Sequence, residues 1–157
     1  MGDFVLTRGW GSVDVLINGQ SVRFITTHLE VPNTPAASGI QLLQVDELVA
    51  GPAATSMPVV MAGDFNSAPG TRGYENLMAT GFTDAWTRSN ADGPGHTCCH
   101  FPLDDPLSSL EMRIDLILTR GGITADAATV VGDQPGDSRD GLWPSDHAGV
   151  VASLCLR

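Results

Sequence analysis

The chain has 157 residues, of which 42% are hydrophobic and 17% charged, so its composition is that of a folded globular domain and excludes a disordered chain. Eighteen acidic residues against eight basic ones give a formal net charge of −10. This charge disfavours extended nucleic-acid binding, because such binding needs a basic surface that displaces counterions from the phosphates. A small phosphoester remains compatible as a substrate, because a bound cation can reverse the local sign of an acidic pocket.

The N-terminal third predicts a hairpin followed by a helix. Residues 12–17 alternate apolar and polar side chains, which is the period of a half-buried strand. Asn18-Gly19 is a strong hairpin-turn signal, and residues 22–27 then predict a second strand. Residues 36–50 place apolar residues among polar ones as an amphipathic helix does.

The middle of the chain predicts a buried strand, a second helix and a long loop. Residues 58–62 are continuously apolar, as expected of a strand buried on both faces, and they lead directly into Gly63-Asp64-Phe65-Asn66. Residues 71–80 predict a helix that ends at a glycine. Residues 90–109 are rich in Gly, Pro, Ser and Asp, which favours a surface loop with at most one short strand.

The C-terminal third predicts three strands. Residues 114–119 and 123–131 are apolar runs separated by two glycines, residues 132–144 form a loop, and residues 148–154 form a closing strand. We find no linker, so residues 1–157 are expected to form a single domain. The pattern of elements predicts an α+β or layered α/β arrangement.

Targeting features are sparse. No apolar run approaches the roughly 20 residues needed to cross a bilayer, so we expect no membrane span. The first residues lack a basic segment followed by an apolar one, so we expect no secretory signal there. Three cysteines, at positions 98, 99 and 155, are too few to predict a disulfide framework, and the compartment stays open.

Four short segments place polar side chains at the ends of predicted strands. They are Thr27-His28-Leu29, Asp64-Phe65-Asn66, Arg113-Ile114-Asp115 and Ser145-Asp146-His147. Strand ends fix the backbone while loops expose side chains, so sites often form there. Together the segments supply an oxygen-rich set of ligands suited to Mg²⁺ or Mn²⁺.

Each segment also has a simpler interpretation. Asp64, Asn66 and Asp146 are common turn formers, and a single histidine such as His28 is most often a structural or solvent-facing residue. Asp115 is harder to explain in this way, because it lies in an apolar run where a carboxylate needs a partner. A histidine would be a natural partner.

In this order, the segments resemble the endonuclease/exonuclease/phosphatase superfamily. The resemblance rests on Thr26-Thr27-His28-Leu29, Gly63-Asp64-Phe65-Asn66-Ser67, Arg113-Ile114-Asp115-Leu116-Ile117 and Ser145-Asp146-His147. The segment Thr97-Cys98-Cys99 is most similar to the bacterial hydrolases of that superfamily. The resemblance covers the C-terminal portion of the family domain, and so implies half of a four-layer α-β-β-α sandwich.

The resemblance implies divalent-metal-dependent hydrolysis of a phosphoester by activated water, with phosphodiesters favoured. Asp64 would activate the water with help from Asn66. His147 would bind the phosphoryl oxygens while Asp115 orients its imidazole, and His28 would contact the phosphate. The physical demand is that a cation and imidazole donors neutralise the non-bridging oxygens while a carboxylate activates water.

The metal ligands follow from the same resemblance. Asp146 would bind the metal, and Asp64, Asn66 and His147 could form a second metal position. Mg²⁺ or Mn²⁺ is expected, and Ca²⁺ is possible. The Asn and the metal-binding Glu of the family's N-terminal half have no counterpart motif in this chain.

The missing half leads to further expectations. One sheet would expose its inner face, so we expect two copies to pack sheet to sheet or by segment exchange as a homodimer. The alternative is a catalytically impaired remnant that acts as a binding module. A third interpretation takes His96, Cys98, Cys99 and His100 as a zinc site, although their spacing is unlike that of known zinc sites.

Overall fold

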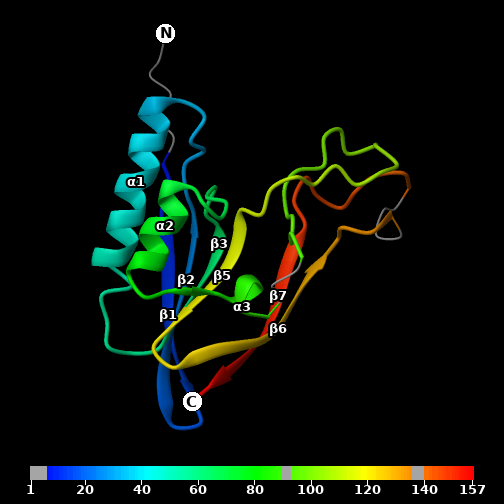
Figure 1. Cartoon of the computed structure of the whole chain (residues 1–157). Coiled ribbons are helices and arrows are strands. Elements are labelled where there is room, and N and C mark those ends of the chain that lie inside the picture. The colour runs from blue at the N-terminus through cyan, green and yellow to red at the C-terminus, as the bar shows by residue number, and fades with distance from the viewer. Residues whose placement is uncertain (1–6, 90–92, 136–139) are drawn as a thin grey trace.

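The computed structural model describes residues 7–89, 93–135 and 140–157, which form two β-sheets and three helices (Figure 1). The larger sheet has the strand order β1-β2-β3-β5-β4, and the smaller sheet pairs β6 with β7. The strands are β1 (Trp10–Ile17), β2 (Gln20–His28), β3 (Val59–Asp64), β4 (Thr83–Asp84), β5 (Asp115–Arg120), β6 (Ile123–Val131) and β7 (Gly149–Leu156). The helices are α1 (Pro35–Ala50), α2 (Arg72–Ala79) and α3 (Ala85–Ser89).

The first hairpin forms where the sequence predicts it. Strands β1 and β2 are antiparallel, and the connecting Asn18 and Gly19 have φ values of 51° and 86°. Both values lie in the left-handed region, as a tight two-residue hairpin requires, and Asn and Gly are the residues that tolerate it best. Strand β2 then pairs in parallel with β3, while β5 returns antiparallel to β3.

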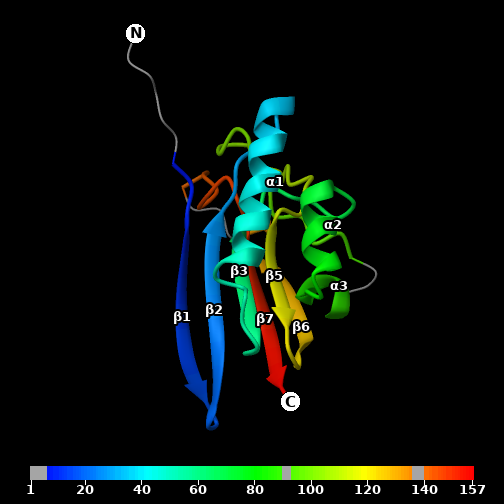
Figure 2. The ribbon, with the colours of Figure 1, turned by 90° about the vertical axis from the view of Figure 1, so that its left-hand side faces the viewer.

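One face of the larger sheet is covered by helices α1 and α2, as Figure 2 shows. Helix α1 begins after Thr34, whose hydroxyl accepts the backbone N–H of Ala37 at 3.1 Å, with Pro35 at the first helical position. The core between helices and sheet is continuous. It contains Ile25, Leu29, Val45, Leu48, Ala53, Val59, Met61, Phe65, Tyr74, Leu77, Phe82, Leu116 and Leu118.

The opposite, inner face of the larger sheet is covered only in part. Successive side chains of a strand point to opposite faces, so Val22 and Val60 point away from the helices. They pack against Ile123 of β6 in a small second core. Val13 and Val15 of β1 lie on the same inner face but are 57% and 39% exposed. A groove of about 380 Å³ beside Val13 continues this apolar surface.

The structure differs from the sequence predictions in two respects. Strand β4 and helix α3 are too short to leave a periodic pattern, and they were not predicted. The chain supplies more than the single sheet expected of half a sandwich, because β6 and β7 leave the first sheet and pair with each other. Its described residues form three layers: helices, the larger sheet and the smaller sheet. No helix in the described part of the chain is both long and apolar enough to cross a membrane.

Candidate active site

The candidate site begins as a row of three polar residues on adjacent strands. His28 is the register partner of Asp64, and Asp64 is the register partner of Asp115. Because β5 runs antiparallel to β2 and β3, its first residue meets their last residues at one edge of the sheet. All three share the inner face with Val22, Val60 and Ile117, and His28 Nε2 lies 3.3 Å from Asp64 Oδ2.

His147 joins this row from the loop before β7. Its Nδ1 lies 2.8 Å from Asp115 Oδ2, and both side chains are about one-quarter exposed. This contact supplies the histidine partner that was predicted for Asp115. Potential ligand atoms of Asp64, Asp115 and His147 all lie within 4.8 Å of one another. The contact leaves the Nε2 atom of His147 available for a substrate.

Gly63 places Asp64 at the end of β3. Its φ is +156°, and a Cβ there would collide with the backbone of Thr27 on the neighbouring strand. The next residue, Phe65, is fully buried in the helix-side core, so the backbone is held on one side while Asp64 points to the other. The glycine of the motif is therefore a packing requirement of the sheet.

Asn66 fixes the carboxylate of Asp64. Its backbone N–H donates to Asp64 Oδ1 at 2.8 Å, and its side-chain amide donates to the carbonyl of Leu29 at 2.9 Å. The turn-forming interpretation of these residues is therefore correct for Oδ1, while Oδ2 faces His28. Gln41 of α1 also donates to the carbonyls of Asn66 and Glu30, at 2.8 and 2.9 Å. Its role was not predicted, because a buried polar residue leaves no distinct signal in a helical pattern.

The segment 97–100 supports Asp115 and His147 from the side. The buried Thr97 hydroxyl accepts the backbone N–H groups of Ile114 and Asp115 at 3.2 and 3.1 Å. The segment also pairs with the residues around His147, because Ala148 N donates to Thr97 O and His100 N donates to Asp146 O, each at 2.8 Å. The segment was predicted to lie in a loop with at most one short strand, because the two isolated bridges of Cys98 leave no periodicity in the sequence.

The electrostatics of the site follow from two nearby carboxylates and two imidazoles. Burial raises the pKa of Asp64, and the negative charge of Asp115 raises it further against the opposing hydrogen bond from Asn66. Burial lowers the pKa of His147, but its hydrogen bond to Asp115 and that carboxylate's charge outweigh the effect, so its pKa is raised. The pKa of His147 is thus shifted toward the protonated imidazole, and the pKa of Asp64 toward the neutral carboxyl.

Some residues of the predicted motifs do not join this group. The side chain of Asp146 is exposed, accepts a hydrogen bond from Ser145 Oγ at 3.3 Å, and belongs to neither metal-competent cluster of the described residues. Arg113 is buried and pairs instead with Asp84 and Thr87 behind the site. In the part of the chain that the structure describes, no glutamate lies in either cluster.

The donor set fits an oxygen-preferring divalent cation. Asp64 and Asp115 offer carboxylate oxygens within 4.8 Å of the His147 imidazole, and a cation there would offset the charge of the two carboxylates. A cavity of about 240 Å³ lies beside Asp64 and Asp115 and reaches Gly149 and Val150 of the second sheet. A larger depression of about 530 Å³, lined by Trp86 and Asp133 among others, includes none of these residues.

Comparison with known proteins gives the class of this chain. A model of the endonuclease/exonuclease/phosphatase family matches residues 3–147, and the chain belongs to this family. Members of the family are hydrolases that act on phosphoesters, and they generally depend on divalent metals. No curated protein matches the chain.

Solved structures share the fold at low sequence identity. An endonuclease/exonuclease/phosphatase from Beutenbergia cavernae is 24% identical, covering 96% of this chain and 40% of its own, with a TM-score of 0.72. A mannosyl-6-phosphatase from Bacteroides thetaiotaomicron is 23% identical over 99% of this chain and 60% of its own, with a TM-score of 0.70. A humanized D. rerio TDP2 is 22% identical over 94% and 60%, with a TM-score of 0.74. The chain therefore spans 40–60% of the length of these structures.

Proposed function

We propose that the chain is the water-activating and phosphate-binding part of a divalent-metal-dependent phosphoesterase, with phosphodiesters as the favoured substrates. The observation that carries the proposal is the alignment of His28, Asp64 and Asp115 across three strands, with His147 bound to Asp115 from the loop before β7. Family membership supports the phosphoester class of the substrate. Low identity to solved structures leaves the individual substrate to experiment.

Asp64 is the residue proposed to activate water. Oδ1 accepts the backbone N–H of Asn66 at 2.8 Å, whereas Oδ2 has only longer contacts, at 3.4 Å to the Asn66 side-chain amide and 3.3 Å to His28 Nε2, so Oδ2 is the oxygen proposed to accept a proton from water. A raised pKa makes this carboxylate a stronger base than an exposed aspartate. Asn66 holds the geometry, because its side-chain amide also ties the loop to Leu29.

His147 is proposed to bind the phosphoryl oxygens. Asp115 accepts the hydrogen bond at Nδ1, which orients the ring and leaves Nε2 to donate to a non-bridging oxygen. The raised pKa favours the charged imidazole, the form that stabilises developing negative charge best. His28 is the most exposed member of the site and is proposed to donate to the phosphate or the leaving group from the opposite side.

Asp64 and Asn66 are proposed to hold one divalent cation, with Asp146 available for another. His147 would join the first cation only as a neutral imidazole, in place of its contact with the phosphate. When bound, Mg²⁺ or Mn²⁺ (or Ca²⁺) would neutralise the non-bridging oxygens and lower the pKa of water. The chain's own residues then place a base and two imidazoles around the phosphate. The absence of a glutamate from the clusters predicts weak metal binding by one copy of the described residues.

We also propose that a second copy of the chain covers the inner face of the larger sheet. Val13 and Val15 expose apolar surface beside the groove of about 380 Å³, and Phe24 and Ala62 continue that surface toward Asp64. An apolar sheet face of this kind is usually covered in a stable assembly. An isologous dimer would place two such faces against each other without adding charge to the interface.

The function is tested with a chromogenic phosphodiester, bis(p-nitrophenyl) phosphate, in the presence of Mg²⁺, Mn²⁺, Ca²⁺ or EDTA. We expect turnover with metal and its loss in EDTA. Asp64→Ala and His147→Ala should each lower kcat/KM by about 10²-fold to 10⁴-fold, because each removes a group that acts on the reacting atoms. His96→Ala serves as the matched histidine control, since His96 belongs to neither cluster of the described residues.

The result can also reject the proposal. Wild-type turnover that resists EDTA and equals that of Asp64→Ala would exclude this mechanism. Absence of turnover above the Asp64→Ala blank with every metal would favour the alternative, a binding module that has lost catalysis. Both arms use protein of measured oligomeric mass, so that an inactive monomer is distinguished from an inactive dimer.

A further inference from the structure

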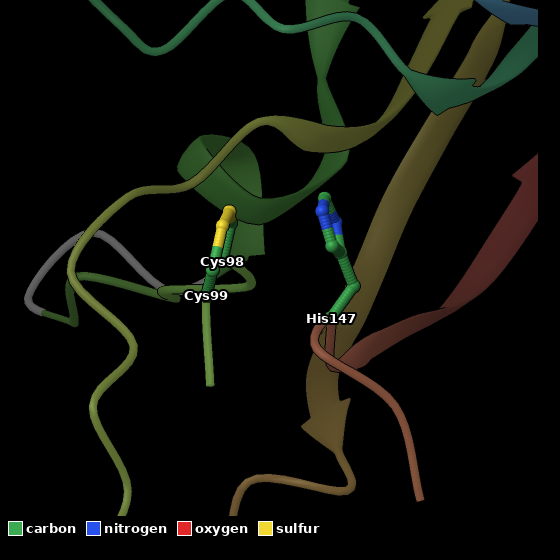
Figure 3. Close-up of side chains that lie close together, drawn as sticks. All are labelled: Cys98, Cys99 and His147. Atoms are coloured by element: carbon green, nitrogen blue, oxygen red, sulfur yellow. A yellow bond between two sulfur atoms is a disulfide. The ribbon is translucent and has the colours of Figure 1, made fainter. Parts of the chain in front are cut away.

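A second cluster of metal-competent side chains lies on the other side of His147. Figure 3 shows Cys98 and Cys99 rising from the segment 97–100 and the imidazole of His147 rising beside them from the neighbouring segment. Potential ligand atoms of the three residues lie within 4.8 Å of one another. The described residues form only two such clusters, and His147 belongs to both.

Backbone pairing explains why these side chains meet. Cys98 forms an isolated antiparallel bridge with His147 on one side and another with Met112 on the other. The flanking bonds from Ala148 N to Thr97 O and from His100 N to Asp146 O, each 2.8 Å, fix the register. Cys98 is 2% exposed, whereas Cys99 and His147 are half-buried, so a small ion can approach from the side of Cys99.

The two histidines of the zinc site that the sequence suggested lie apart from Cys98 and Cys99 in the structure. His100 is fully buried with its ring stacked on Trp143 at 3.9 Å between centroids, and His96 Nδ1 lies 3.1 Å from the carbonyl of Leu110. Neither belongs to a metal-competent cluster of the described ranges. His147 comes instead from a distant segment, so the set has ligands from two parts of the chain, as zinc sites commonly do.

We propose that Cys98, Cys99 and His147 form a separate site for a thiophilic divalent cation such as Zn²⁺, available when the two cysteines are reduced. The structure joins the two sulfurs in a disulfide, and a disulfide offers no thiolate to a metal. Reduction by a phosphine cleaves the S–S bond: the two sulfurs take up two electrons and two protons, and phosphorus becomes the phosphine oxide with oxygen from water. Binding of the cation then displaces the thiol protons.

The site has a consequence for catalysis that rests on the proposed function. Because His147 is shared, a cation held by the sulfurs competes for the imidazole that the phosphate needs. Zn²⁺ should therefore inhibit the Mg²⁺-supported reaction of the reduced protein, and it should inhibit the disulfide form less. The binding of the cation itself does not require any turnover.

The experiment titrates Cd²⁺, a spectroscopic substitute for Zn²⁺, into the whole chain after phosphine reduction and removal of the reductant. We expect thiolate-to-cadmium charge-transfer absorbance that saturates near one equivalent in the reduced protein and is missing from the disulfide form. Cys98→Ala, Cys99→Ser and His147→Asn should each weaken binding by about tenfold or more, since each removes a ligand. Cys155→Ser is the matched control. Cys155 is an exposed cysteine of β7 that forms no disulfide, and its thiol donates a hydrogen bond to Asp126.

The outcomes separate the two proposals. Equal cadmium binding by the Cys98→Ala and Cys99→Ser variants, or loss of the absorbance in Cys155→Ser alone, would overturn the site. Binding in wild type that is unchanged by His147→Asn would remove the histidine from it. Thermal unfolding of each reduced variant shows that it is folded. An inactive protein that still binds cadmium through these residues would contradict the proposed function and leave this site standing.

Discussion

The two faces of the larger sheet differ in how many buried apolar residues pack on them. Among the described residues, thirteen buried apolar residues form the helix-side core, whereas three form the core between the two sheets. Val13 and Val15 remain exposed on the inner face. The helix side therefore supplies most of the burial that stabilises this chain, because hydrophobic stabilisation follows the apolar area removed from water.

The chemistry lies at the edge of the sparsely covered face. His28, Asp64 and Asp115 point to the inner side, while their sequence neighbours Leu29, Phe65 and Leu116 are buried under the helices. A substrate must reach the site from solvent, whereas core side chains must be shielded from it. Because successive side chains of a strand point to opposite faces, adjacent residues serve the site and the core.

Substitutions on β5 should show the largest difference in unfolding free energy between the two faces. Leu118→Ala removes a fully buried side chain from the helix-side core and should cost about 2–5 kcal/mol of unfolding free energy. Ile117→Ala, the adjacent position on the inner face, is only half-buried and should cost clearly less, about 1 kcal/mol. Urea unfolding measures both. Equal losses would show that the inner face is as well packed in solution as the helix side.

The second test asks what covers the inner face. If two copies pack through it, Val13→Lys should shift the protein from dimer to monomer by placing a charge in an apolar interface. Leu16→Lys is the matched control, because Leu16 lies on the same strand but points to the other face and is 70% exposed. Light scattering at micromolar concentration measures both masses. A folded wild-type monomer would contradict the dimer.

The smallest expected effect is the loss of unfolding free energy that the ionised Asp64 causes. Asp64 has a pKa raised above 3.8 in the folded chain, so folding favours its protonated form. In EDTA, wild-type unfolding free energy should fall as pH rises from 3.8 through the folded pKa, and Asp64→Asn should be more stable than wild type above that window. Added Mg²⁺ should make wild type more stable than Asp64→Asn.

The pKa of His147 is raised above 6.5, and this contributes stability that is present below 6.5 and is lost as pH rises through the folded pKa. That second loss should occur in wild type and in Asp64→Asn, and it should be missing from His147→Asn. Urea midpoints measured across the acidic and neutral range separate the two windows. A flat profile for Asp64→Asn near neutrality would contradict the His147 contribution.

Local patterns predicted most of the sheet and the polar ends of its strands. The turn at Asn18-Gly19, the buried strand before Gly63 and the closing strand all have strong local signals, and the structure has each of them. The histidine partner of Asp115 was predicted because a carboxylate in an apolar run requires one. The remaining assignments came from resemblance in the order of four motifs.

What the sequence did not predict depends on contacts between distant segments. Thr97 supports Asp115 through hydrogen bonds to a strand that lies far along the chain, and one bridging residue leaves no periodicity. Gln41 is a polar residue at a buried helical position, which cannot be distinguished from an exposed glutamine by pattern. Arg113 shares a motif with Asp115 yet turns to Asp84 instead, a choice set by packing.

The row of His28, Asp64 and Asp115 would also make the proposed activity a measure of sheet assembly. The three residues are aligned by the same ladders that pair β2 with β3 and β3 with β5, and a slip of one residue would turn a side chain toward the helices. Pairings between distant strands form late because their loops must close first. During refolding, helical signal should therefore return before the proposed phosphoesterase activity, and the interval between the two would time the completion of the central strands.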